Sequence, residues 1–354
     1  MAIVDELTSG AAGEGLSRVV RDLLSDVPDI EQPNIYPMEW HGDPDSKLAT
    51  LYERAKVQMW NPSDLPWEDL DPDVWTPEQR IGMMYWFAVL ANFDASGPPV
   101  FAQAMVHAYQ HHHEDPVRKC FFSITRDEVN HEEACGRAIQ TLVPGGPLGF
   151  EPQTDLERAA LNNIGWLYHN GGRYWNGYSA SLDKYPLAVL FTSFMMGEVA
   201  SSTLFRSMAD HTRHPIFKEM FTRIGRDESR HLQICLQLLD KDWPGLSEEL
   251  KPLVTRQMRA GFVFLSMILW EPPSQFWDLP DYFLPNHRVL MDHARDAGLG
   301  VLSYEEQAEN WRLALGRVAK IVERWGIAFP AIPELDFAGV DVGDIDLDDI
   351  IPVF

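Results

Sequence analysis

The sequence predicts an all-α protein: a four-helix bundle with additional flanking helices and an irregular N-terminal segment wrapped over it. Helix-start signals dominate the 354 residues. A ten-residue pattern occurs twice, as "RDEVNHEEAC" from Arg126 and as "RDESRHLQIC" from Arg226, 100 residues apart. Hydrophobic residues make up 45% of the chain, so a sizeable core can form.

Three regions are expected within one structural domain. Residues 1–75 are rich in Pro, Asp and Trp, as in "WNPSDLPWEDLDPDVW", and predict an ordered wrap over the bundle. Residues 76–270 are expected to form the bundle. Residues 271–354 supply further helices, after a Pro- and aromatic-rich connection at 271–290, and an acidic tail. The tail is predicted either to dock in extended form or to stay mobile.

Prolines and capping residues predict where the helices begin. Bundle helices open with proline near the first position, at Thr76-Pro77, Asp115-Pro116, Tyr185-Pro186 and Pro215. Proline fits there because the first N–H groups of a helix have no intrahelical partner. Other starts are predicted at Thr154 with Glu157, at Ser247, and at Ser303 with Glu306. Gly326 is predicted to end the last helix.

The composition excludes several classes of protein. With 53 acidic and 29 basic residues the formal net charge is −24, which disfavours binding to nucleic acid or to an anionic membrane surface. Three cysteines do not suggest a disulfide framework. The start of the chain lacks a secretory signal pattern, and the apolar stretch at 262–270 is too short to span a bilayer. We therefore expect a cytoplasmic protein.

The repeat places a carboxylate and an imidazole three residues apart in each copy: Glu128 with His131, and Glu228 with His231. Positions i and i+3 lie on one face of a helix, so each pair can bind one metal ion. Two such pairs and one carboxylate from each of two other helices form a two-metal site in a four-helix bundle. Glu198 is one such carboxylate, because a buried charge on its apolar helix is costly without a partner.

The second extra carboxylate is less regular. The position that corresponds to Glu198 in the first copy is Pro98, which offers no side-chain ligand. Asp94 is the nearest upstream carboxylate and is predicted as the sixth ligand. Prolines at 98 and 99 are expected to distort the helix and bring Asp94 into reach. Gln103 and His107 are the alternatives.

"DEVNH" and "DESRH", with Glu198 between them, resemble the paired motifs of the ferritin-like di-iron carboxylate superfamily. The resemblance covers about residues 77–240. This superfamily includes bacterial multicomponent hydroxylases, acyl-carrier-protein desaturases, ribonucleotide reductase small subunits and aryl-amine N-oxygenases. Asp94 departs from the more common Glu, although reductase small subunits use Asp there. The resemblance implies metal ligation by Glu128, His131, Glu198, Glu228 and His231.

The resemblance also implies a crossed support for the imidazoles. Asp127 would hold His231 and Asp227 would hold His131, each through the ring N–H that faces away from the metal. Adjacent helix positions are 100° apart, so each Asp points toward the neighbouring helix. We expect an Asp oxygen within about 3.2 Å of the opposite His nitrogen. The arginine before each Asp is expected to help neutralise it, namely Arg126 and Arg226.

Cys135 and Cys235 each lie seven residues after a motif Glu and are therefore predicted to point inward. A small buried core residue is the favoured reading for both, and a place at the substrate pocket is the other. Reductase small subunits carry their radical Tyr at the position of Cys135, so a tyrosyl-radical reductase is disfavoured. Cys135 resembles the residue that methane-hydroxylating relatives carry at this position.

Four carboxylates and two imidazoles carry a charge of −4 and suit two iron ions, with manganese possible, better than zinc. We predict an O2-activating di-iron oxygenase that hydroxylates or N-oxygenates a small organic substrate and receives electrons from a ferredoxin or reductase. Aryl-amine N-oxygenases carry an additional His four residues before the last motif Glu. This chain has Ile224 at that position, which disfavours the N-oxygenase subgroup. A desaturase and a ferroxidase-type iron-binding protein are the alternatives. A substrate-sized cavity beside Glu198 would favour the oxygenase, and a homodimer is possible.

Overall fold

The computed structural model describes residues 46–181, 185–271 and 277–343, and within these it is built from helices. The residues described contain no β-strand beyond two isolated bridges near residue 335. The fold is therefore all-α, as predicted. The α-helices are α3 (Lys47–Val57), α4 (Pro77–Gln110), α5 (Asp115–Leu142), α6 (Asp155–Ser181), α7 (Leu187–His211), α8 (Pro215–Asp242), α9 (Lys251–Leu269), α10 (Phe283–Asp296) and α11 (Tyr304–Glu323).

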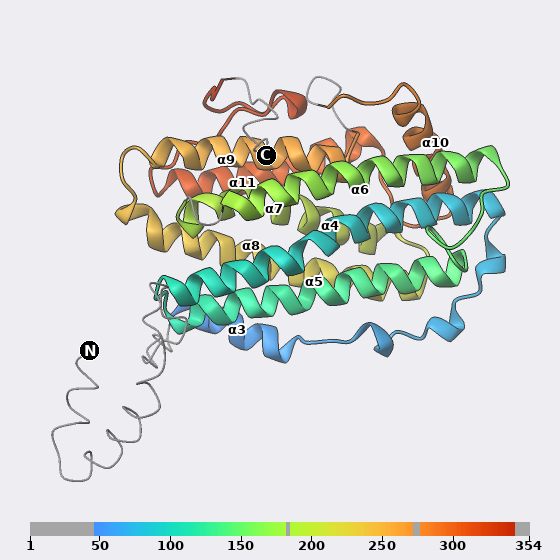
Figure 1. Cartoon of the computed structure of the whole chain (residues 1–354), viewed down its shortest axis with the longest axis horizontal. Coiled ribbons are helices and arrows are strands. Elements are labelled where there is room, and N and C mark those ends of the chain that lie inside the picture. Colours follow the sequence, from blue (N-terminus) through green and yellow to red (C-terminus); the bar gives the residue numbers. More distant parts are fainter. Residues whose placement is uncertain (1–45, 182–184, 272–276, 344–354) are drawn as a thin grey trace, which may run out of the picture.

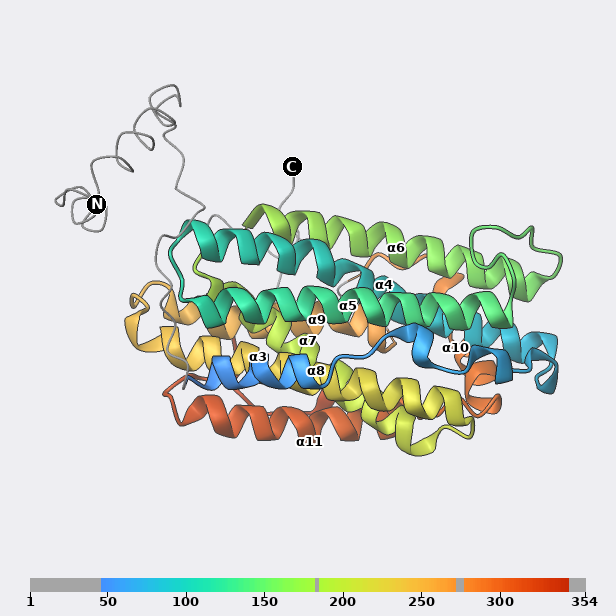
Figure 2. The same cartoon turned by 90° about the horizontal axis from the view of Figure 1, so that it is seen from below.

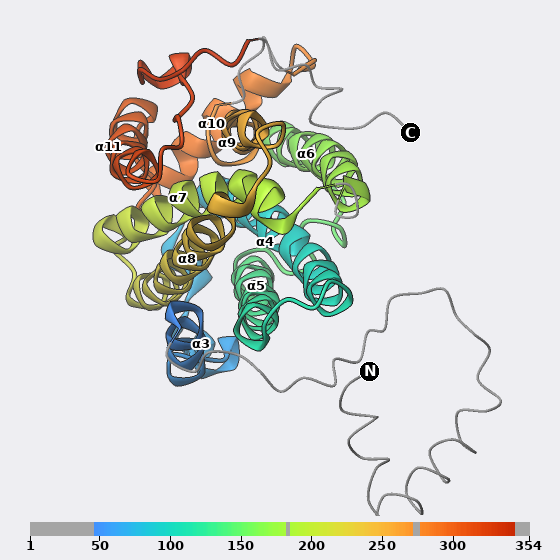
Figure 3. The same cartoon turned by 90° about the vertical axis from the view of Figure 1, so that its left-hand side faces the viewer.

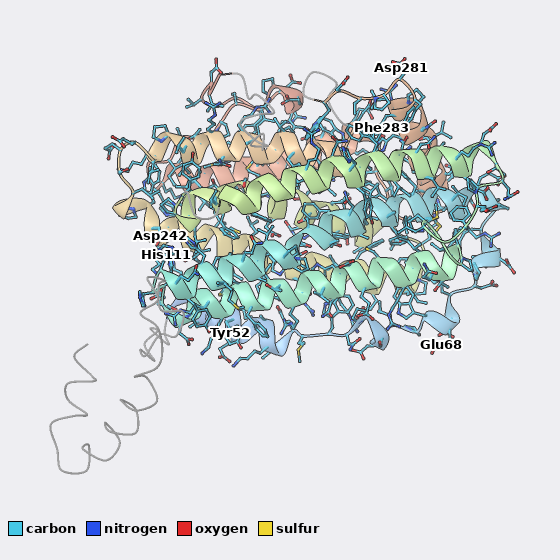
Figure 4. The ribbon with its side chains drawn as sticks, in the orientation of Figure 1. Tyr52, Glu68, His111, Asp242, Asp281 and Phe283 are labelled. Carbon is cyan, nitrogen blue, oxygen red and sulfur yellow. The ribbon has the colours of Figure 1, made fainter. Side chains whose placement is uncertain are left out.

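Helices α4, α5, α7 and α8 form a four-helix bundle, which is seen end-on in Figure 3. The two helices that carry the repeat, α5 and α8, are antiparallel. Lys241 near the end of α8 lies 2.9 Å from Glu114, the residue before α5. Figure 4 shows the ends of α4 and α8 at the same end of the molecule, marked by His111 and Asp242. The repeat is thus arranged around an approximate two-fold axis.

The remaining helices cover the bundle (Figure 1). Helices α9 and α11 pack on α7, whereas α6 and α10 pack on α4. Helix α3 packs on α5 and α8, and the chain continues from it along the bundle through short 3₁₀ helices (Figure 2). The predicted wrap is therefore partly helical. Residues 1–45 and most of the acidic tail lie outside the described residues.

One predicted segment was wrong. The connection expected at 271–290 contains the start of α10 at Phe283, at the side of the molecule marked in Figure 4. Pro285 is compatible with this helix because it lies in the first turn, where its missing N–H has no intrahelical acceptor. Leu290 and Met291 of α10 are buried in the core. Packing thus extends a helix across a stretch that composition alone assigned to a loop.

The predicted helix starts agree with the structure except at Ser247, because α9 begins four residues later, at Lys251. Thr76 and Gln79 form a reciprocal capping box, and Ser303 does the same with Glu306. Gly326 has the positive φ of 81° that permits a left-handed turn after α11. Among the described residues, α7 is long and apolar enough to cross a bilayer, but 89% of its apolar window is buried within the protein. It is the central helix of the core.

Candidate metal centre

Six side chains from the four bundle helices converge in the centre of the bundle. Each helix of the repeat contributes its Glu and His from one face, because the two residues lie one turn apart. All six residues are at most 3% exposed to solvent. They are Asp94 of α4, Glu128 and His131 of α5, Glu198 of α7, and Glu228 and His231 of α8.

The six residues form two overlapping groups that could each hold one metal ion. One contains Asp94 and His131, and the other contains Glu198 and His231. Both groups include Glu128 and Glu228. Within each group the potential ligand atoms lie within 4.8 Å of one another. The arrangement therefore offers two neighbouring metal positions bridged by two shared carboxylates.

Asp94 joins this cluster, whereas the two alternatives do not. Gln103 is exposed, and His107 lies near the end of α4 with its ring 4.0 Å from that of His111. Prolines 98 and 99 lie inside α4, which continues from Pro77 to Gln110. Asp94 therefore reaches the centre from within a continuous helix.

Both imidazoles turn one nitrogen outward and the other inward. Nε2 of His131 lies 3.4 Å from Oδ2 of Asp227, and Nε2 of His231 lies 3.3 Å from Oδ2 of Asp127. The crossed pairing is the expected one, at distances slightly longer than 3.2 Å. Each Nδ1 instead faces the carboxylates, 3.2 Å from Glu228 and 3.1 Å from Glu128 respectively.

The ligand atoms that face the centre of the site are better placed to bind a cation than to form hydrogen bonds with one another. Several are fully buried and lack a hydrogen bond of good geometry to any described residue: both Asp94 carboxylate oxygens, Nδ1 of His131 and His231, Oε2 of Glu198 and Oε1 of Glu228. Unpaired buried polar atoms are costly, and they cluster here in one place. Two divalent cations would satisfy them and balance the charge of −4. The oxygen-rich donor set suits iron or manganese.

The electrostatics of the site point the same way. Burial raises the pKa of Asp94 well above its usual range, and burial and the charge of Glu228 do the same to Glu198. Burial opposes the ionisation of Glu228, but interactions with His131 and Glu198 lower its pKa to about 2. Burial disfavours charge on His131 and His231, yet nearby carboxylates raise the pKa of both rings. The raised pKa values favour protons on Asp94, Glu198 and the two imidazoles, and a bound metal ion would displace these protons.

The aspartates are neutralised mainly by a residue that the repeat did not predict. Arg230 Nη2 donates to Oδ2 of Asp127 at 2.6 Å and to Oδ1 of Asp227 at 2.9 Å. Arg126 lies 2.5 Å from Asp127, as expected, whereas Arg226 is 3.6 Å from Asp227. Arg230 therefore links the supports of the two imidazoles. The sequence signal that could have indicated this role is the position of Arg230 directly before His231.

The N-terminal wrap closes this side of the site. Trp60 Nε1 donates to Asp227 at 2.7 Å, and its ring stacks near His131 with centroids 6.4 Å apart. Arg230 Nη1 donates to the Gln58 side chain at 2.7 Å, and Asn130 donates to the Trp60 carbonyl at 2.9 Å. Residues 58–60 thus seal the gap between α5 and α8. Sequence reasoning assigned them no role at the site.

Two small residues support the shared carboxylates. The Ser201 hydroxyl donates to Oε2 of Glu228 at 2.8 Å. Gly97 leaves room for Glu128, because an added Cβ would lie only 2.6 Å from Cγ of Glu128. These contacts fix where the two carboxylates that belong to both groups can lie.

Both motif cysteines are buried beside the centre. Burial and the charge of Asp94 raise the pKa of Cys135, while burial and the charge of Glu198 raise that of Cys235. Both thiols are therefore protonated core groups. A place for either cysteine at the substrate pocket stays a prediction.

No protein-family model matches the chain, and no curated protein does either. Solved structures do match. An R2-like ligand-binding oxidase with an aerobically reconstituted Mn/Fe cofactor is 15% identical, with 79% of this chain and 93% of that chain covered and a TM-score of 0.52. A mutant of an R2-like ligand-binding oxidase, with the same cofactor, is 16% identical, with 79% and 98% covered and a TM-score of 0.54. The chain therefore has the fold of the ferritin-like di-metal carboxylate proteins.

Proposed function

We propose that the chain is an O2-activating di-metal oxygenase that acts on a small organic substrate by hydroxylation or N-oxygenation. The observation that carries the proposal is the pair of four-residue groups that share Glu128 and Glu228. Two metal positions bridged in this way can act together on one diatomic molecule. The similar solved oxidases bear an Mn/Fe cofactor, which supports an oxidase or oxygenase over a purely structural metal site.

A bound pair of iron ions, or of manganese and iron, would supply the electrons and the Lewis acidity that O2 chemistry requires. The protein's own residues hold and orient the pair. Glu128 and Glu228 would contact both ions, while Asp94 with His131 and Glu198 with His231 would complete one position each. The crossed aspartates fix which ring nitrogen faces the metal. Near-complete burial of the six residues excludes bulk water.

The proposed reaction requires an external electron donor, such as a ferredoxin or reductase, because transfer of one oxygen atom of O2 to a substrate needs two further electrons to reduce the other atom to water. We propose that the enzyme is cytoplasmic and forms a homodimer in solution. The net charge of −24 supports a small molecule as substrate over nucleic acid or a membrane surface.

A ferroxidase-type activity is the second candidate, because the same buried cluster of four carboxylates and two imidazoles could bind and oxidise iron. Oxidation of iron itself needs no cavity for an organic molecule. A desaturase, by contrast, would need a long one.

One experiment separates these activities. Iron-loaded protein is reduced without O2, mixed with candidate substrates and ¹⁸O2, and the products are measured by mass spectrometry. An oxygenase incorporates ¹⁸O into the organic product, whereas a desaturase removes two hydrogens without incorporation. A ferroxidase consumes O2 only in proportion to added iron. The control is Glu228→Ala, which removes a carboxylate of both groups. Equal O2 consumption by this variant would refute a reaction at the proposed centre.

A further inference from the structure

A groove of about 230 Å³ lies on the outer side of the protein, between α7 and α11. These helices pack side by side (Figure 3). Arg206 and His211 line the groove from α7, and Asn310 and Arg317 line it from α11. Asp210 is the only carboxylate residue of its lining. A chain with a net charge of −24 therefore gathers two guanidinium groups around one hollow.

Neither guanidinium is neutralised by another residue that the structure describes. Among the described residues, Arg206 and Arg317 form no ion pair, and Arg206 has only a long 3.4 Å contact with the Ser229 hydroxyl. Two other arginines behave differently: Arg312 pairs with Glu309 on the same helix, and Arg223 pairs with Glu219. Unpaired cations that face one groove create a local positive potential in an otherwise acidic protein.

The floor of the groove offers further hydrogen-bonding groups. A second cavity of about 10 Å³ shares Ser207 and Asn310 with the groove and is also lined by Trp311. Oγ of Ser207 and Nε1 of Trp311 are buried, and neither has a hydrogen-bond partner among the described residues. Trp311 is only 1% exposed. Beneath the arginines the groove therefore adjoins two buried groups that can each make a further hydrogen bond.

We propose that this groove binds a small oxyanion, a phosphate or carboxylate group carried on a small molecule. The guanidinium fork matches the geometry of both groups and can donate two parallel hydrogen bonds to either. The amide of Asn310 and the hydroxyl of Ser207 supply uncharged donors beneath the arginines. His211 donates from Nδ1 to the Ser207 carbonyl at 2.8 Å, so only the doubly protonated ring would also donate to the anion from Nε2.

The size of the groove limits the ligand. A volume of 230 Å³ corresponds to about eight water molecules in the liquid, so inorganic phosphate or a four-carbon dicarboxylate fits. The site is separate from the proposed metal centre. Arg206 lies eight residues after Glu198 on α7, which is about 12 Å along the helix. A ligand held by both arginines would link α7, which carries Glu198, to α11.

Isothermal titration of the full-length protein tests the proposal. Sodium phosphate and sodium succinate are titrated separately at constant ionic strength, with sodium chloride as the reference. We expect saturable binding of at least one oxyanion with a Kd of about 1 mM or lower, and no saturation with chloride. Tighter binding of phosphate or of succinate identifies which of the two groups the natural ligand carries.

The variant Arg206→Gln/Arg317→Gln should bind the same anion at least tenfold more weakly. Both side chains are exposed, so this variant is expected to fold. Arg312→Gln is the matched control, because it removes one exposed positive charge from α11 outside the groove, and its affinity should equal that of the wild type. Two results would overturn the proposal: no saturation by either oxyanion below about 10 mM, or equal binding by the wild type and the double variant.

Discussion

The two halves of the site, α4 with α5 and α7 with α8, share the Glu and His that face the metal positions, but they differ in the remaining carboxylate, Asp94 or Glu198, and in the residues that support the ligands. In each half a Glu and a His come from one helix and a carboxylate from its partner. The supports do not repeat. Ser201 bonds Glu228, but the residue 100 positions earlier is Phe101, which packs against Phe191 and Phe194.

The residue before each His also differs. Arg230 of α8 bonds both aspartates, whereas Asn130 of α5 bonds the carbonyl of Trp60. Arg230 thus binds the aspartates of both halves and also contacts the wrap at Gln58, whereas Asn130 anchors the wrap at Trp60. The comparison teaches that the motif Glu and His recur in both halves, while the residues that balance the charge and close the site do not.

The largest effect should come from the residues common to both metal positions. Glu128→Ala and Glu228→Ala each remove a ligand from both groups, so metal content should fall from about two ions per chain to nearly none. Loss of a buried carboxylate also relieves like-charge repulsion, so the variants should still fold. Metal analysis after anaerobic iron loading and desalting is the measurement. The exposed neighbour Glu132→Ala is the control and should retain both ions. Two ions in Glu228→Ala would disprove the shared role.

A smaller effect is expected from the carboxylates that belong to one half each. Asp94→Ala and Glu198→Ala each disrupt a single group, so each variant should keep about one ion per chain. The same metal analysis applies, with spectroscopy of the remaining ion to distinguish the two positions. If Asp94→Ala keeps both ions while Glu198→Ala loses one, the two halves are not equivalent and Asp94 is not a ligand.

The crossed aspartates should have a graded effect. Asp127→Asn and Asp227→Asn keep the size of the side chain but weaken the hold on the opposite ring, so iron affinity should fall by roughly 10–100-fold in a folded protein. Competition with a chelator measures the affinity. Because Trp60 also bonds Asp227, the second variant should lose more than the first. Unchanged affinity in both would mean that the aspartates do not position the rings.

The sequence was sufficient to predict the bundle and the position of every repeated residue, because helical periodicity and a repeat of 100 residues constrain them directly. It was insufficient for Trp60, which reaches Asp227 from 167 residues away along the chain. Arg230 was missed because its counterpart is Asn130, so no repeat marked it. The start of α10 at Phe283 was missed because burial against α4 and α6 outweighs its prolines and aromatics. These contacts join segments that are distant along the chain, so a local sequence pattern cannot predict them.

The smallest effect is expected from substitution of two equivalent glycines. Gly97 and Gly197 each lie 31 residues before a motif Glu, so they allow a direct comparison of the two halves. An added Cβ at Gly97 would lie 2.6 Å from Cγ and 3.1 Å from Cβ of Glu128, whereas at Gly197 the nearest atoms are 3.7 Å away. Alanine favours a helix over glycine by about 1 kcal/mol at either position. At Gly97 overpacking of about 1–3 kcal/mol should offset that gain.

Gly197→Ala should therefore raise the free energy of unfolding and leave iron affinity unchanged. Gly97→Ala should gain no stability, and its iron affinity should fall by about tenfold, because Glu128 must rotate away from both metal positions or α4 and α5 must separate. Urea unfolding of the metal-free proteins and chelator competition measure the two quantities. The metal-free comparison isolates the packing cost from the loss of ligand geometry. Identical iron affinities in the two variants would show that Glu128 can move without consequence, and the close approach of Gly97 would then be a packing feature of α4 and α5 alone.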